Sequence, residues 1–142
     1  MADNLPTIWK ADPHTFAKHE ILKVYLQKWS TILSNYIKDR KQFLLFVDGF
    51  AGPGIYKGGE DGSPILAIKT VLNHSQRFPT PISFLFIEED KERHDVLIGL
   101  LKRMKQQTDE SEKISTIDIE LGDCEDILNG KITDLDNKGH RF

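Results

Sequence analysis

The segment FLLFVDGFAGPGIY, residues 43–56, constrains the fold of this chain more than any other. Its first five residues are apolar and show no polar alternation, which is typical of a strand buried on both faces of a parallel sheet. Three glycines follow within six positions, although glycine in regular structure costs about 0.5–1 kcal/mol relative to alanine. The pattern therefore predicts a strand and then a loop whose backbone must come close to something else.

Helix and strand patterns alternate along the rest of the chain. Asp12-Pro13 is typical of a helix start, because Asp caps free backbone N–H groups and Pro fits the first helical turn. Apolar side chains then recur every three or four residues up to Tyr36, which predicts an amphipathic helix of about six turns. The same reasoning gives strands over 43–48, 82–90 and 114–122, and further helices from an N-cap at Ser63 to about Asn73, from Asp90, and from Asp123 to near Gly130.

The third strand differs from the first two, because Ile117, Ile119 and Leu121 alternate with polar residues. A strand at the edge of a sheet is expected to have one solvent-exposed face of this kind. Each strand is followed by a helix, and the rule of right-handed crossovers then places the three strands in one parallel sheet. We therefore expect an α/β, Rossmann-like sheet in the order third, second, first strand, which is the first half of a doubly wound nucleotide-binding fold.

Such a fold also needs a fourth strand beside the first one, next to the ligand crevice. Residues 131–142 contain no apolar run long enough to supply it. We expect the chain to be a fragment of a longer protein; the alternative is that the N-terminal helix or another chain covers the first strand. The expected organisation is a lead-in and amphipathic helix over 1–41, followed by the N-terminal half of a cofactor-binding domain over 42–142.

Composition argues against several classes of protein. The lone cysteine, Cys124, rules out an internal disulfide and a multi-cysteine zinc site, and we expect no metal. No window reaches the ~18–20 apolar residues of a membrane span, and the start MADNLPTIWK is not a signal peptide. We therefore expect a cytoplasmic protein without a membrane partner. The net charge of −3 lacks the strongly basic character of most nucleic-acid binders.

Three acidic residues, Asp48, Glu88 and Asp123, end or follow the three predicted strands. Because neighbouring strands lie about 4.8 Å apart, these carboxylates would spread over roughly the width of a nucleoside. An acid after the second strand can accept both ribose hydroxyls, and one after the third can accept from an amine such as that of adenine. Acids in these places are also common helix N-caps, so it is their recurrence on three strands that predicts an adenine-nucleoside site.

The glycine segment narrows the choice of ligand. No window fits the P-loop pattern of nucleotide hydrolases, and Lys57 stands where the dinucleotide fingerprint requires a third glycine. Asp48, directly before the loop, would repel a pyrophosphate but suits a cationic ligand. S-adenosylmethionine offers such a cation in its amino group and sulfonium. NAD is the alternative, and it would make the protein an oxidoreductase.

The stretch FVDGFAGPG resembles the first motif of class I S-adenosylmethionine-dependent methyltransferases, especially the D-x-F-x-G-x-G form of nucleic-acid methyltransferases. More narrowly, about residues 9–125 are similar to the three-Cys-motif partner protein family. The residues that carry this resemblance are Lys18-His19-Glu20-Ile21-Leu22 with Tyr25 and Trp29, the segment Asp48–Pro64, and FLFIEED over Phe84–Asp90.

The resemblance implies methyl transfer from S-adenosylmethionine, with nucleic acid as the substrate class and a three-cysteine protein as partner. The implied cofactor residues are Asp48, Phe50, Gly52 and Gly54 for the methionine part, Glu88 for the ribose, and Asp123 with the backbone of Cys124 for the adenine. The chain departs from the methyltransferase pattern in two respects. The stretch 56–62 is longer than the usual step from loop to helix, and the fourth-strand motif resembling D-P-P-Y is missing. The methyl acceptor and the catalytic residues therefore stay unassigned.

Other interpretations stay open. The same acids and glycines would persist in a non-catalytic, Rossmann-like assembly module that works with a second protein. On the first helix, Lys18 and His19 have no assigned role; His19 lies one position off the Tyr25/Trp29 stripe and could face a ligand, although a histidine there is more often a boundary residue. Cys124 begins a helix inside the cofactor motif, and we expect it to pack there and not to act as a nucleophile.

Overall fold

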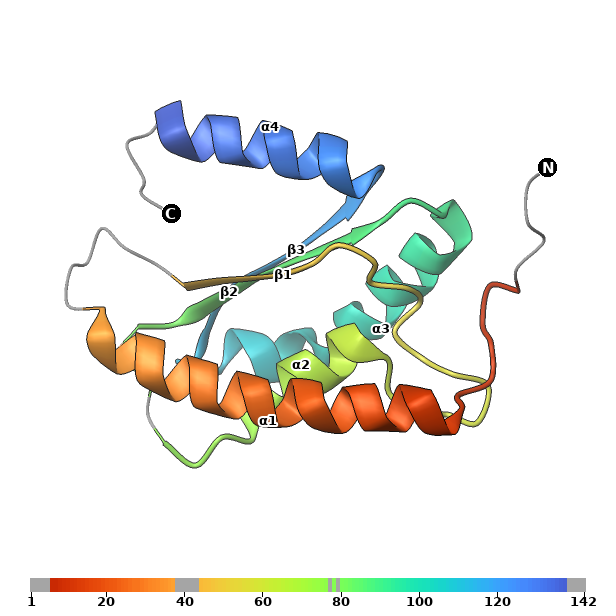
Figure 1. Ribbon diagram of the computed structural model, residues 1–142, viewed down its shortest axis with the longest axis horizontal. Helices are drawn as coiled ribbons and strands as arrows, with labels where there is room; N and C mark the ends of the chain where they lie inside the picture. The colour runs from red at the N-terminus through yellow and green to blue at the C-terminus, as the bar shows by residue number, and fades with distance from the viewer. Residues whose placement is uncertain (1–5, 38–43, 77, 79, 138–142) are drawn as a thin grey trace.

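The computed structural model describes residues 6–37, 44–76, 78 and 80–137. Helices and strands alternate over these residues as the sequence predicts (Figure 1). The elements in chain order are α1 (Pro13–Tyr36), β1 (Leu44–Asp48), α2 (Ser63–Leu72), β2 (Ile82–Glu88), α3 (Lys91–Asp109), β3 (Ile114–Leu121) and α4 (Cys124–Asn137). The predicted boundary between residues 41 and 42 and the first residue of the predicted strand, Phe43, lie outside the described residues. No helix in the described ranges is long and apolar enough to cross a membrane.

The three strands form one parallel sheet in the order β1-β2-β3, as predicted. Pairing runs from Leu44 opposite Ile82 to Glu88 opposite Leu121. Every residue of β2 is buried, whereas β3 mixes half-buried isoleucines with exposed polar residues, as expected of an outer strand. Because the strands are parallel, their carboxyl ends meet at one edge of the sheet.

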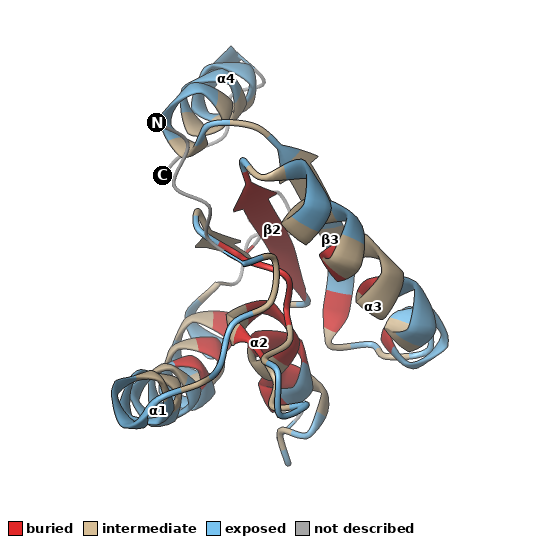
Figure 2. Ribbon diagram, turned by 90° about the vertical axis from the view of Figure 1, so that its right-hand side faces the viewer, coloured by how far each residue is buried: buried red, intermediate tan, exposed pale blue. Residues whose placement is uncertain are grey.

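Helices cover the two faces of the sheet unequally. α1, α2 and α3 lie on one face, and α4 lies over the other (Figure 1). The core fills the first of these layers and includes Phe84 and Phe86 of β2, Ile68 of α2, Leu97 of α3 and Leu26 of α1. α4 has no fully buried residue, so the face of the sheet beneath it is the more open one (Figure 2).

α1 begins where the sequence predicts. The Asp12 carboxylate accepts a hydrogen bond from the backbone N–H of Thr15 at 2.9 Å, and Pro13 occupies the first turn. The helix packs against α2, and its fully buried residues include two small ones, Ser30 and Ser34. The Ser30 hydroxyl donates within its own helix, and the Ser34 hydroxyl bonds to the backbone of residue 80. Both polar groups are therefore satisfied where they are buried.

The apolar stripe predicted on α1 is wider than the surface that the rest of the chain covers. Three of its residues, Leu22, Trp29 and Leu33, pack against the core. Five others stay exposed, namely Phe16, Ile21, Tyr25, Ile32 and Tyr36. Ile21, Tyr25, Ile32 and Tyr36 share one side of the helix by their spacing, and we call these four residues the α1 stripe.

β1 departs from the prediction of a strand buried on both faces. Leu44 is buried, but the four residues after it are only half-buried. The reason is position, because β1 lies at the edge of the sheet and pairs only with β2 among the described strands. The sequence of β1 is therefore more apolar than a half-buried edge strand needs to be.

α4 starts as predicted but ends later than expected. Asp123 caps it by accepting a hydrogen bond from the backbone N–H of Asp126 at 3.1 Å. The prediction of an end near Gly130 is wrong, since the helix continues to Asn137. Apolar residues keep helical spacing on both sides of the glycine, at Leu128 and Ile132 among others, and this outweighs the intrinsic cost of glycine in a helix.

Replacing Gly130 with alanine tests this extended helix. A Cβ added there meets no heavy atom within 4 Å, and the glycine does not have a positive φ. Gly130→Ala is therefore expected to raise the free energy of unfolding by about 0.4–1 kcal/mol, measured by urea titration. A loss of stability would instead place a helix end at this glycine.

Candidate functional site

The carboxyl ends of the strands border a cavity of about 730 Å³. It is lined by the loop after β1, the end of β2, Arg93 of α3, the N-terminal part of α4 and the lead-in residue Trp9, and we call it the strand-end cavity. Five of the seven predicted cofactor residues line it: Phe50, Gly52, Glu88, Asp123 and Cys124. The topology thus brings together residues that lie far apart in the sequence.

The glycine loop is fixed onto β2 by its backbone. Ala51 donates its N–H to the carbonyl of Ile87 at 3.0 Å, and Gly52 donates to Oε2 of Glu88 at 2.7 Å. Gly52 has a φ of +69°, a left-handed conformation that favours glycine. Glycine at this position therefore lets the loop after β1 turn back onto the neighbouring strand β2.

Glu88 is the most constrained of the three acids. It is only 6% exposed, although it stands at the end of a strand and borders the cavity. Oε2 accepts from Gly52, and Oε1 accepts from the backbone N–H of Asp90 at 3.1 Å. A carboxylate oxygen has a second lone pair, so Glu88 can hold the loop and still accept from a ligand in the cavity.

Asp123 and Cys124 form the opposite wall of the strand-end cavity. Asp123 is exposed and caps α4, whereas Cys124 is half-buried. A Cβ added to Gly49 would clash with the sulfur of Cys124, so a larger residue at position 49 would force the Cys124 side chain to move. Cys124 thus packs against the loop after β1, in keeping with the predicted packing role.

Asp48 and Gly54 do not line the strand-end cavity. Oδ2 of Asp48 accepts from the Ser63 hydroxyl at 2.5 Å, and Oδ1 accepts from the backbone N–H of Phe50 at 3.2 Å. Ser63 was predicted as an N-cap, but Gly62 takes that position and Ser63 lies inside α2. Its hydroxyl is therefore free to orient the Asp48 carboxylate.

Gly54 has a structural role in the loop. A Cβ on it would lie 2.9 Å from Cδ1 of Leu97, and its φ is +83°. Gly62 donates its N–H to the Gly54 carbonyl at 2.8 Å, and a Cβ on Gly62 would lie 2.8 Å from the carbonyl carbon of Gly54. The two glycines close the base of a small hairpin over 55–61, in which Ile55 bridges to Asp61. This hairpin accounts for the long stretch between the glycine loop and α2.

Among the lining residues of the strand-end cavity that sequence reasoning missed are Trp9 and Arg93. The Arg93 guanidinium lies 4.7 Å from the centre of the Trp9 ring, a cation–π contact. Trp9 is held in turn by its carbonyl, which accepts from the N–H of Lys57 at 3.1 Å. Nothing in the local sequence pattern marks either residue as part of a site.

A second cavity, of about 470 Å³, lies between α1 and β1. We call it the α1 cavity. Its lining includes Lys18 and His19 of α1, Phe46 and Asp48 of β1, and Tyr56 of the hairpin. Gly49 lines both cavities, so the two spaces adjoin at the carboxyl end of β1.

Two aromatic groups of the α1 cavity have shifted pKa values. Burial lowers the pKa of His19, although the nearby Asp61 carboxylate acts in the opposite direction. Burial also raises the pKa of Tyr56, with a further contribution from the carboxylates of Asp12 and Asp48. Both side chains therefore favour their neutral forms, in which each can donate a hydrogen bond and the imidazole can also accept one.

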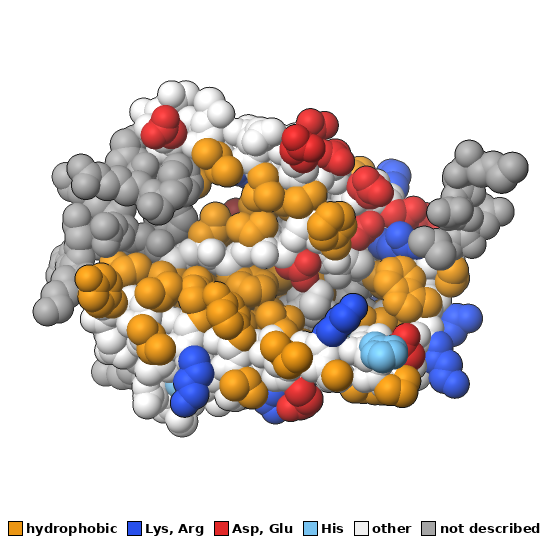
Figure 3. Space-filling view, viewed as in Figure 1, with side chains coloured by type: hydrophobic (Ala, Val, Ile, Leu, Met, Phe, Trp, Pro, Cys, Tyr) orange, Lys and Arg blue, Asp and Glu red, His pale blue; other side chains and the backbone are white. Residues whose placement is uncertain are grey.

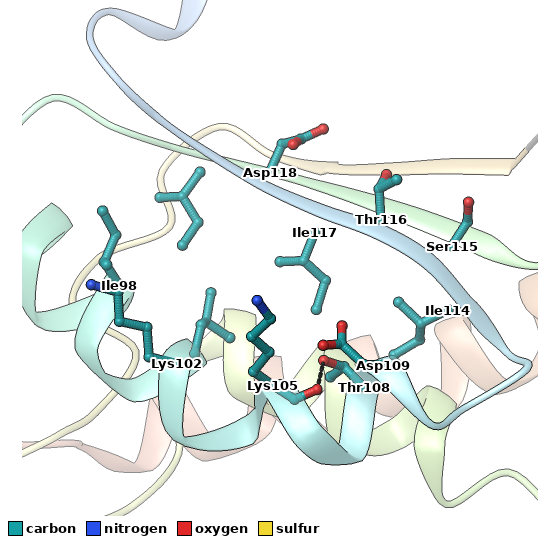
Figure 4. A pocket seen from close by; sticks show the side chains of 12 residues that line it. Ile98, Lys102, Lys105, Thr108, Asp109, Ile114, Ser115, Thr116, Ile117 and Asp118 are labelled. Carbon is teal, nitrogen blue, oxygen red and sulfur yellow. Dashed lines mark hydrogen bonds between the residues drawn. The ribbon is translucent and has the colours of Figure 1, made fainter.

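A groove of about 700 Å³ between α3 and β3 is of a different kind (Figure 4). Isoleucines of β3 and the lysines Lys102 and Lys105 line it, and Thr108 donates to the Lys105 carbonyl within α3. It contains none of the predicted site residues. The groove follows the outer edge of the sheet and lacks the strand-end acids, so the candidate site is the pair of cavities that adjoin at the carboxyl end of β1.

Comparisons with protein-family models, with curated proteins and with solved structures found no match to this chain. Among the described residues, no group of three or more His, Cys, Asp or Glu side chains is placed to hold a metal ion.

The role of Glu88 in holding the loop can be tested by Glu88→Gln, with Glu89→Gln as control. Glutamine keeps one acceptor but turns an N–H₂ group toward one of the two backbone donors. We expect Glu88→Gln to lower the free energy of unfolding by about 1–3 kcal/mol, and the exposed Glu89→Gln to change it little. Equal stability of the two variants in urea titrations would show that Glu88 does not anchor the loop.

Proposed function

We propose that this chain is the cofactor-binding part of an S-adenosylmethionine-dependent methyltransferase. The observation that supports this most is the strand-end cavity, which collects the glycine loop and two of the three strand-end acids at the carboxyl edge of a parallel sheet. Ligands of open α/β sheets bind at this edge. The cavity volume also falls within the roughly 300–1,000 Å³ typical of small-molecule sites.

The residues present fit the three parts of this cofactor. Asp123, exposed at the start of α4, would accept from the adenine amine, and Glu88 would use its remaining lone pairs for the ribose hydroxyls. Gly52 and Phe50 would border the methionine part, and Asp48 would meet its ammonium group from the adjoining α1 cavity. The side chain of Phe50 is 87% exposed at present, so it is available to cover a ligand.

When bound, S-adenosylmethionine supplies an electrophilic methyl group: the lone pair of a nucleophile bonds to the methyl carbon as the carbon–sulfur bond breaks and its electrons stay on sulfur. The chain's own contribution would be to position the cofactor and the nucleophile in line. The resemblance of FVDGFAGPG to the first methyltransferase motif supports the same assignment. Nucleic acid as the substrate class and the three-Cys-motif partner family rest on that resemblance alone.

Calorimetric titration with S-adenosylhomocysteine tests this proposal. We expect binding to the full chain, weakened about tenfold or more by Asp48→Asn, which removes the charge but keeps the shape. Ser63→Ala is the matched control, since it removes the hydroxyl that orients Asp48 but leaves the carboxylate. Its effect should be smaller than that of Asp48→Asn. Binding of NAD without binding of S-adenosylhomocysteine would favour an oxidoreductase and overturn the proposal.

A second candidate function is supported by a different observation. The α1 stripe is unusually exposed for apolar residues, with Ile21 at 71% and Tyr36 at 81%, and β1 pairs only with β2 among the described strands. Figure 3 shows hydrophobic side chains gathered over α1 and across the hollow between α1 and α4. Exposed apolar patches commonly mark protein–protein interfaces. The chain would then serve as a non-catalytic module that assembles with another protein.

A methyl-transfer assay separates the two candidates. The chain is incubated with S-adenosylmethionine labelled in its methyl group and with single-stranded or double-stranded nucleic acid. Label recovered on the nucleic acid, and lost in Asp48→Asn, supports the enzyme. A chain that binds S-adenosylhomocysteine but transfers no label favours the assembly module.

A further inference from the structure

The α1 cavity lies where the reacting end of the cofactor would point, and this step rests on the proposed function. The proposed order of contacts runs from adenine at the end of β3, through ribose at the end of β2, to methionine at the end of β1. Beyond β1 along the same line lies the α1 cavity, which Gly49 and Asp48 connect to the strand-end region. A methyl acceptor must approach at the methionine end, and this cavity is the space available there.

The lining of the α1 cavity is partly apolar and partly polar. Leu22, Phe46 and Val47 supply apolar walls from α1 and β1. His19 and Tyr56 face each other with ring centres 5.8 Å apart. Small-molecule sites typically combine apolar walls with a few polar groups that fix the orientation of the ligand.

Neither the imidazole of His19 nor the hydroxyl of Tyr56 has a hydrogen-bond partner in the described part of the chain. The two rings are nevertheless not loose. Trp9 packs edge-on against Tyr56 with ring centres 6.4 Å apart, and the backbone N–H of Tyr56 donates to the Glu60 carbonyl at 2.9 Å. The cavity therefore presents two unpaired polar groups on aromatic rings that neighbouring groups hold in place.

We propose that the α1 cavity binds the methyl acceptor as an amino-bearing, planar nitrogen heterocycle of the nucleobase type, with His19 and Tyr56 contacting its ring and polar edge. Such a ring matches the apolar walls and can stack on aromatic side chains, while its edge offers both a donor and an acceptor. Methylation of its amine leaves one extra proton on nitrogen, and the unprotonated ring nitrogen of His19 can take it and pass it to solvent. His19 and Tyr56 would thus be substrate-contacting residues of the proposed enzyme.

Nuclear magnetic resonance on the full chain saturated with S-adenosylhomocysteine tests this inference. Free adenine, cytosine and guanine are added one at a time, and the imidazole signals of His19 are followed. We expect at least one base to bind and to shift these signals. Tyr56→Phe, which removes only the hydroxyl, should weaken that binding about three- to tenfold, and His19→Gln should weaken it at least as much.

Matched controls come from the same helix. His14 and Tyr25 are exposed on α1 outside the cavity lining, so His14→Gln and Tyr25→Phe should leave base binding unchanged. Unfolding temperatures of all four variants confirm that the fold is kept. A single-stranded oligonucleotide of the preferred base gives the second arm: tighter binding than the free base points to nucleic acid, and equal binding points to the free heterocycle.

Several results would overturn the inference and leave the proposed function standing. One such result is that no base shifts the His19 signals although S-adenosylhomocysteine binds. Another is that the cavity variants bind the base as their controls do. Alternatively, His19→Gln weakens S-adenosylhomocysteine binding as strongly as Asp48→Asn does, in which case the cavity belongs to the cofactor. A chain that binds no S-adenosylhomocysteine overturns the proposed function first and removes this inference with it.

Discussion

The site depends on one buried carboxylate at the end of β2. Glu88 accepts from Gly52 in the loop after β1 and from Asp90 at the start of α3, while its own backbone carbonyl accepts from Gly122 after β3. One residue thus joins the ends of all three strands. A buried charge is tolerated only when it is well hydrogen-bonded, and here the bonds that satisfy the charge are also those that shape the loop. The hydrogen bonds that offset the cost of burying Glu88 therefore also set the geometry of the strand-end cavity.

Much of the fold could be predicted from local pattern. Asp12, Asp90 and Asp123 each cap the helix that the sequence assigned to them, because an N-cap needs only its own backbone neighbours. The strand order followed from the wet face of β3. Gly130 misled the prediction, since a glycine that ends a helix and one that a helix passes through look alike unless the spacing of the residues beyond it is weighed.

The site could be predicted only in part. Asp123 and Gly52 were found because an acid or a glycine at a strand end is visible in the sequence. Trp9 and Arg93 were missed because their contact joins residues far apart in the chain, and no local pattern records it. The burial of Glu88 could not be read from the sequence, because one of its two backbone donors, Gly52, lies 36 residues away in the loop after β1. The exposed α1 stripe and the half-buried strand β1 share one property. Both carry more apolar surface than the described chain covers.

The hairpin over 55–61 has a base whose geometry must be kept and a tip whose length can vary. Its base is fixed by the contact between Gly54 and Gly62, whereas Gly58 and Gly59 at its tip are exposed. A tip of different length leaves both ends of the hairpin in register, so the loop after β1 and the start of α2 do not move. The chain can therefore accept an insertion between Gly58 and Gly59, such as a reporter peptide or a labelling tag. The insertion would lie close to the candidate site and would leave the loop after β1 and the start of α2 in place.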